Sequence, residues 1–143
     1  MTTLNSELII DPNIFRQNIS YIKKKLNKSS NFMAVIKSDA YGHHLENIVR
    51  DIDDLADGYG VVRTDEALKI RKLSDKKILL MQGIYNESDF KLARKNNLDM
   101  VVHNIEQFNI AKKFSEYNNL WFKVNTGMNL SLIHISEPTR LRR

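Results

Sequence analysis

The chain has 143 residues, of which 42% are hydrophobic and 27% charged, a balance typical of one folded globular domain. It contains no cysteine, which excludes disulfides, thiolate metal sites and a cysteine nucleophile, and which fits a reducing compartment. The formal net charge is +5, but the only basic run, residues 23–25, has no accompanying aromatic stripe, so nucleic-acid binding is not expected.

No apolar run approaches the roughly 20 residues that a membrane-spanning helix needs. Residues 1–6 lack the charged and then apolar pattern of a signal peptide. The sequence therefore predicts a cytoplasmic protein that does not associate with membranes.

Short apolar segments alternate along the chain with segments of helical periodicity. The expected strands cover residues 8–10, 32–36, 58–62, 77–81, 100–102 and 120–124. The expected helices cover residues 12–26, 44–52, 64–73, 86–95 and 104–117. The expected helix caps are Asp11, Thr64 or Asp65, Asn86 or Ser88, and Asn104. The continuous apolar run at residues 32–36 predicts a strand buried on both faces.

This rhythm of strand and helix with short connections predicts a parallel α/β sheet. An open doubly wound sheet and a (β/α)8 TIM-type barrel both fit it. The first strand is not followed by a G-x-G-x-x-G motif, which disfavours dinucleotide binding. Because a complete barrel has eight units over about 250 residues, this chain is expected to supply about five of the eight.

One lysine stands at a chemically informative place. Lys37 ends the apolar run and is followed by Ser38-Asp39-Ala40-Tyr41-Gly42-His43, a small and polar segment. In parallel α/β folds, catalytic residues gather at the carboxyl ends of strands. Partial loss of water around an amine favours its neutral form, so Lys37 is predicted to be a nucleophile.

The segment from Met33 to His43 resembles the cofactor-lysine motif of alanine racemases, commonly V-V-K-A-D-A-Y-G-H-G. The resemblance implies that Lys37 holds pyridoxal 5'-phosphate as a Schiff base and exchanges protons with the substrate on one face. It also implies that Tyr41 donates a hydrogen bond to the cofactor phosphate. His43 matches a family position without an assigned role, and His44 replaces a frequent glycine.

A second block, Phe122 to Asn129, resembles racemase strings such as L-K-V-N-T-G-M-N-R-L-G. The lysine that matches Lys123 is carbamylated in some members of the family. The resemblance implies that a carbamylated Lys123 would orient an arginine that binds the substrate carboxylate. No metal site is implied.

That arginine is expected at position 130, where this chain has Leu130. Residues 130–140 resemble the translation of a transposase sequencing adapter. We therefore expect residues 1–129 to be the amino-terminal part of the racemase barrel and residues 130–143 to be an artefactual tail. The family's second catalytic residue, a tyrosine from the partner subunit, is expected downstream.

The resemblance implies an alanine racemase fragment, from an enzyme that interconverts L- and D-alanine for peptidoglycan synthesis and that forms a homodimer. Alone, the fragment is expected to be inactive. One alternative is a serine or broad-specificity racemase of the same fold. Another is a non-enzymatic pyridoxal-phosphate homeostasis protein, against which the block around Lys123 argues. A soluble α/β binding module with a fortuitous lysine is the third.

Overall fold

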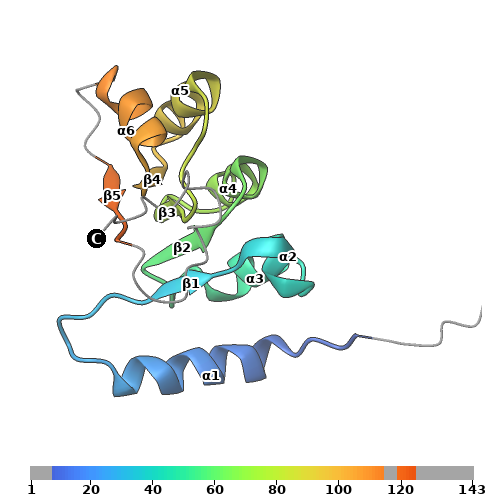
Figure 1. Ribbon diagram of the computed structural model, residues 1–143. Coiled ribbons are helices and arrows are strands. Elements are labelled where there is room, and N and C mark those ends of the chain that lie inside the picture. The colour runs from blue at the N-terminus through green and yellow to red at the C-terminus, as the bar shows by residue number, and fades with distance from the viewer. Residues whose placement is uncertain (1–7, 115–118, 125–143) are drawn as a thin grey trace, which may run out of the picture.

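The computed structural model describes residues 8–114 and 119–124. Five parallel strands form one sheet, and helices fill the connections between them (Figure 1). The strands are β1 (Met33–Val35), β2 (Gly58–Val61), β3 (Lys77–Leu80), β4 (Asp99–Val102) and β5 (Leu120–Phe122). The helices are α1 (Pro12–Lys25), α2 (Lys37–Tyr41), α3 (Leu45–Ile52), α4 (Thr64–Arg71), α5 (Glu87–Lys95) and α6 (Ile105–Lys112).

The strand order separates the two architectures that the sequence left open. The strands lie in the order β1-β2-β3-β4-β5, so each new strand joins the same edge of the sheet. A doubly wound sheet reverses its order at a switch point, whereas a barrel does not. The sheet also curves into an arc, with helices α3 to α6 along its outer side (Figure 1). The prediction of a partial TIM-type barrel is confirmed, and the doubly wound alternative is wrong.

The core lies between the middle strands and the helices that cover them. Leu45, Ile48, Val49 and Ile52 of α3 are at most 1% exposed, as the sequence pattern predicts. Every residue of β2 and β4 is buried. Because burying one large aliphatic side chain contributes roughly 1.5–3 kcal/mol, this layer carries much of the stability.

The helix starts follow the predicted caps with one exception. The side chains of Asp11, Asn86 and Asn104 each accept hydrogen bonds from the first turn of their helices. The prediction of Thr64 or Asp65 as a cap is wrong, because Arg63 occupies the cap position of α4. The backbone N–H of Arg63 donates to Glu66 Oε2 at 3.2 Å, so a side chain of the first helical turn reaches back to the cap residue.

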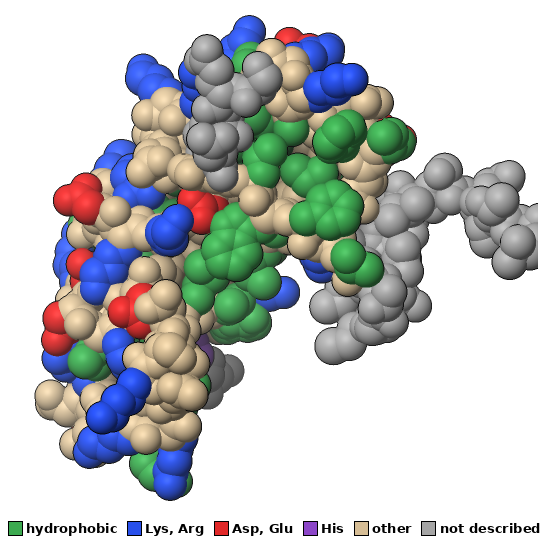
Figure 2. All heavy atoms as spheres, turned by 90° about the vertical axis from the view of Figure 1, so that its left-hand side faces the viewer, with side chains coloured by type: hydrophobic (Ala, Val, Ile, Leu, Met, Phe, Trp, Pro, Cys, Tyr) green, Lys and Arg blue, Asp and Glu red, His purple; other side chains and the backbone are tan. Residues whose placement is uncertain are grey.

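The sequence predicts the ends of the sheet less well than its middle. Residues 8–10 do not form the expected strand, and Leu8 and Ile9 are 61% and 80% exposed. Val35 of β1 is 40% exposed, so the prediction of a strand buried on both faces is wrong. All three residues of β5 are exposed. Hydrophobic side chains gather on the face of the molecule on which β5 lies (Figure 2). The physical reason is that an edge strand has a neighbour on one side only.

Helix α6 ends at Lys112, short of the predicted end at Tyr117. Most of the second matched block, from Asn125 onward, lies outside the described residues, as does the predicted tail at residues 130–143. No helix within the described part of the chain combines the length and the apolar character that crossing a membrane requires.

Candidate functional site

The carboxyl ends of all five strands lie at one edge of the sheet, because the strands are parallel. Lys37 follows β1 after one intervening residue, and Lys123 follows β5 directly. Both predicted lysines therefore lie at the carboxyl ends of strands. They are at opposite sides of the sheet, because β1 and β5 are its two outermost strands. In barrels of this type, this edge is where substrates bind.

Lys37 and Tyr41 are brought together by the turn that follows β1. Lys37 Nζ lies 5.9 Å from the centroid of the Tyr41 ring. Lys37 is half-buried, whereas Tyr41 is 60% exposed. Ile36, just before the lysine, is buried, and its N–H donates to Gly60 O of β2 at 2.9 Å. The lysine is thus anchored through a fixed backbone, with its amine next to a phenol.

The turn that carries these two residues is left-handed. Ser38, Asp39 and Ala40 have φ of 53–54°, Tyr41 has 56° and Gly42 has 86°. A left-handed helical conformation costs roughly 1–2 kcal/mol for each residue with a Cβ atom. Only Gly42 occupies this region without steric penalty. Strain of this kind persists only where surrounding contacts hold it, and it concentrates at functional sites.

Hydrogen bonds within the segment hold part of this turn. Ala40 N–H donates to Ile36 O at 3.0 Å, and Leu45 N–H donates to Asp39 Oδ1 at 2.9 Å. His43 Nδ1 contacts Ala40 O at 2.9 Å. Asp39 and His43 thus support the turn. Sequence reasoning gave neither of them this role, because the only local signal of a left-handed turn was Gly42.

Lys123 is fixed by the sheet rather than by a turn. Its N–H donates to Val102 O at 3.0 Å, which continues the pairing of β5 with β4 past Phe122. Its side chain is half-buried. The structure describes one more residue, Val124. The rest of the matched block, residues 125–129, lies outside the described part of the chain.

At this end of the strands, one turn brings an amine and a phenol close together. An amine of this kind adds to a carbonyl carbon, and a phenol O–H donates to an anionic oxygen. The pair therefore suits a compound with both an aldehyde and a phosphate. No group of three His, Cys, Asp or Glu side chains able to hold a metal ion occurs among the described residues.

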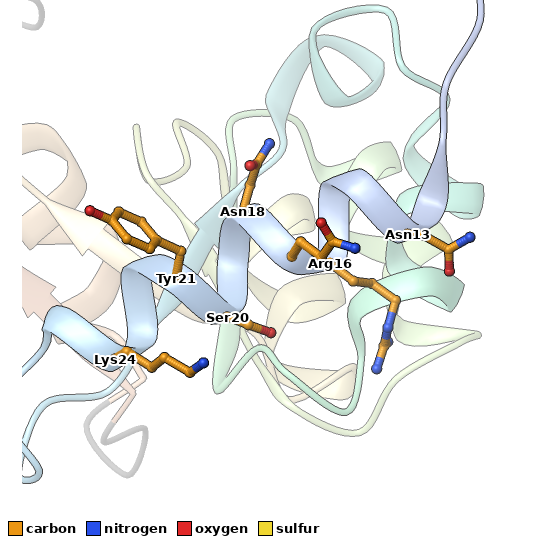
Figure 3. Close-up of a pocket in the computed structure, with 7 residues that line it drawn as sticks. Asn13, Arg16, Asn18, Ser20, Tyr21 and Lys24 are labelled. Atoms are coloured by element: carbon orange, nitrogen blue, oxygen red, sulfur yellow. The ribbon is translucent and has the colours of Figure 1, made fainter.

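A broad hollow elsewhere on the molecule does not qualify as the site. Its lining comes entirely from α1, which packs against α3 (Figure 3). The lining residues are Asn13, Arg16, Gln17, Asn18, Ser20, Tyr21 and Lys24. One helix cannot enclose a ligand, and neither predicted lysine lies on α1, so this hollow is a solvated helix surface.

Comparison with known proteins points to one family. Residues 10–132 match the family described as alanine racemase, N-terminal domain. The alanine racemase of Mannheimia succiniciproducens is 36% identical over 125 residues, which cover 85% of this chain and 35% of that protein. The alanine racemase of Haemophilus influenzae is 36% identical over 122 residues, which cover 83% of this chain and 34% of that protein.

Solved structures agree with the sequence matches. The biosynthetic alanine racemase of Pseudomonas aeruginosa superposes with a TM-score of 0.71 at 30% identity, over 78% of this chain and 32% of that one. The alanine racemase of Acinetobacter baumannii gives a TM-score of 0.77 at 27% identity, over 85% and 35%. This chain thus spans about a third of the length of the relatives it matches.

Proposed function

This chain belongs to the alanine racemase family, and from that premise we propose that it forms the amino-terminal part of an enzyme that interconverts L- and D-alanine. The observation that carries the proposal is the pairing of Lys37 with Tyr41 at the carboxyl end of β1. Both residues lie inside the matched range, on the edge of the sheet where such barrels bind substrate.

We propose pyridoxal 5'-phosphate as the cofactor, because the donor set of this site fits it. The amine of Lys37 suits the aldehyde, and the hydroxyl of Tyr41, on an exposed ring, suits the phosphate. When bound, this cofactor accepts the electron pair left at the substrate Cα once a proton is removed.

The residues of this chain would divide the work between them. Lys37 would hold the cofactor covalently and, once a substrate amine displaces it, would take or return the Cα proton on its own side. Tyr41 would fix the phosphate. Lys123, at the far end of the arc, would orient the group that binds the substrate carboxylate.

The proposal extends to the whole enzyme through the family resemblance. We propose a cytoplasmic homodimer that supplies D-alanine for peptidoglycan, with alanine as its amino-acid substrate. The partner subunit would supply the catalytic group for the opposite face of the substrate.

The cofactor role of Lys37 is testable on residues 1–143 without any turnover. The chain is incubated with pyridoxal 5'-phosphate, reduced with borohydride, and digested for peptide mass spectrometry. Lys77 is the matched control, because it begins β3 at the opposite end of the strands and its side chain is 66% exposed, whereas Lys37 is half-buried. We expect the adduct mainly on Lys37. Labelling that follows exposure, with Lys77 ahead of Lys37, would refute the assignment.

A further inference from the structure

Glu66 is a buried carboxylate that no part of the proposed chemistry uses. It is the third residue of α4 and is only 7% exposed. Burying a polar group is costly unless hydrogen bonds satisfy it. Its surroundings should therefore explain its presence.

The two oxygens of Glu66 join the loops that follow two neighbouring strands. Oε2 accepts from the N–H groups of Val62 and Arg63, just after β2, at 3.4 and 3.2 Å. Oε1 accepts from the N–H of Asp39, inside the left-handed turn after β1, at 3.3 Å. One side chain thus ties the lysine-bearing turn to the next strand of the sheet.

The equivalent residue in another unit shows that this choice of side chain is specific. Gln107 is the third residue of α6, is 2% exposed, and also reaches back to a strand end. Its Oε1 accepts from His103 N–H at 3.0 Å, but its Nε2 donates to Gln82 O at 2.7 Å. Gln107 faces one donor and one acceptor, which an amide matches. Glu66 faces only donors, which a carboxylate matches and an amide does not.

We infer that Glu66 is a positioning residue, which holds the left-handed turn after β1 and thereby aims Lys37 and Tyr41 at the site. Ser38 to Tyr41 all pay the steric cost of the left-handed conformation, so an external contact must offset it. Glu66 supplies such a contact from outside the segment of residues 36–45, through its hydrogen bond to Asp39 N–H. The inference rests on the proposed role of Lys37, but the rigidity of the turn is measurable without the cofactor.

Glu66→Gln is the diagnostic substitution, because it keeps the size of the side chain. The amide oxygen should stay where two N–H groups converge, those of Val62 and Arg63, so the NH₂ group faces the N–H of Asp39 and the turn loses its acceptor. Amide hydrogen exchange over residues 36–45 should accelerate roughly tenfold, as expected for the loss of one hydrogen bond to a charged group. Selective labelling of Lys37 by pyridoxal 5'-phosphate should fall by a similar factor.

Gln107→Glu is the matched control, since it also mismatches a buried third-position side chain. It should lower thermal stability, yet leave both the exchange of residues 36–45 and the labelling of Lys37 unchanged. Equal exchange in the Glu66→Gln chain and the unaltered chain would overturn the inference. If the unaltered chain shows no preference for Lys37, the proposed cofactor role fails, while the exchange measurement still decides the role of Glu66.

A rescue variant separates the support of the turn from a general folding role. Glycine adopts the left-handed conformation without steric cost, so Ser38→Gly should reduce the need for Glu66. The double variant Glu66→Gln/Ser38→Gly should recover most of the lost protection and labelling. If Glu66→Gln alone does not fold, the double variant should. A double variant no better than Glu66→Gln would overturn the inference.

Discussion

The sheet has two rims, one where the strands begin and one where they end, and they differ in how their charged and aromatic groups are held. At the rim where the strands begin, charged side chains find their partners within the chain. At the rim where the strands end, Lys37 and Tyr41 lie in the segment with the strained turn, and Lys123 directly follows the edge strand β5. The ring atom Nδ1 of His103, just after β4, is buried without a hydrogen-bond partner in the described part of the chain.

Arg71 illustrates the first rim. Its guanidinium donates to four backbone carbonyls, at 3.0 Å each, and so joins the segments that enter β3 and β4. Asp99 is 2% exposed, accepts from Trp121 Nε1 at 2.7 Å and pairs with Lys77 at 3.4 Å. Groups satisfied in this way stabilise the fold and have little capacity left for a ligand.

Tyr59 repeats the pattern inside the sheet. Its hydroxyl donates to Asp53 at 2.9 Å, and burial raises its pKa well above the ordinary value. We propose that one rim of this sheet serves stability and the other serves chemistry, and the following changes test that division.

The largest expected effect is the loss of function at the chemical rim. Lys37→Ala should abolish the selective pyridoxal-phosphate adduct, because residues 36–45, which follow β1, contain no other lysine. In a full-length enzyme, it should also lower the racemisation rate by several orders of magnitude. Thermal stability should barely change, as measured by circular dichroism. Selective labelling that survives this substitution would mean that another amine holds the cofactor.

Arg71→Met should have the largest effect at the stability rim. We expect a loss of about 3 kcal/mol in the free energy of unfolding, because each hydrogen bond to a charged donor contributes about 1.5–3 kcal/mol and water replaces part of the four. Urea denaturation measures this change.

Arg50→Met is the control for this prediction, since Arg50 is exposed and pairs with Glu46 only at 4.0 Å. It should change stability little. The Arg71→Met variant itself should keep the ratio of Lys37 to Lys77 labelling of the unaltered chain, as long as the urea concentration leaves it folded. A changed ratio would break the division between the rims.

Tyr41→Phe should have a smaller effect, confined to cofactor affinity. One hydrogen bond to a charged phosphate contributes roughly 1.5–3 kcal/mol, so the half-saturating concentration of pyridoxal 5'-phosphate should rise about ten- to a hundredfold. Labelling of Lys37 at increasing cofactor concentration measures it. Tyr21→Phe, on the exposed surface of α1, is the control. Unchanged affinity would mean that the Tyr41 hydroxyl does not contact the phosphate.

The smallest expected effect is a pH dependence at the stability rim. The hydrogen bond from Phe32 N–H, with help from Lys23, holds the pKa of Asp57 below its ordinary value of 3.8. A lowered folded-state pKa means that the contribution is complete above pH 3.8 and is lost as the pH falls through the folded value.

Asp57→Asn should therefore lower the melting temperature slightly at pH 6. The gap to the unaltered chain should close as the pH falls below 3.8, because the unaltered chain then loses the same interaction. A gap that stays constant down to pH 2.5 would show that the charge of Asp57 is irrelevant.

The sequence was sufficient for features that depend on local pattern. The apolar face of α3 and the caps Asp11, Asn86 and Asn104 follow from periodicity and side-chain chemistry, and they are confirmed. The site was reached through the string around Lys37, whose catalytic role stays a prediction.

The rest could not be read locally because it depends on partners distant in the chain. Ser38 and Ala40 have no preference for the left-handed region and Asp39 has only a weak one, and the contact from Glu66 comes from 27 residues away from Asp39. Arg71 joins the entries to two strands, and two of its acceptors, Asn96 O and Asn97 O, lie 25 and 26 residues away in the sequence. The exposure of Val35 reflects its place at the edge of the sheet, which no window of residues reveals.

The sequential strand order has a consequence for how this molecule is made. Paired residues of neighbouring strands are close in the sequence. Met33 and its partner Gly58 are 25 residues apart, and Gly58 and its partner Lys77 are 19 residues apart. Short separations lower the entropy cost of closing each contact and speed folding. Synthesis proceeds from the amino terminus, so β1 and β2 can pair while later units are still on the ribosome. Lys37 would then be placed in its turn long before the opposite wall of the barrel exists.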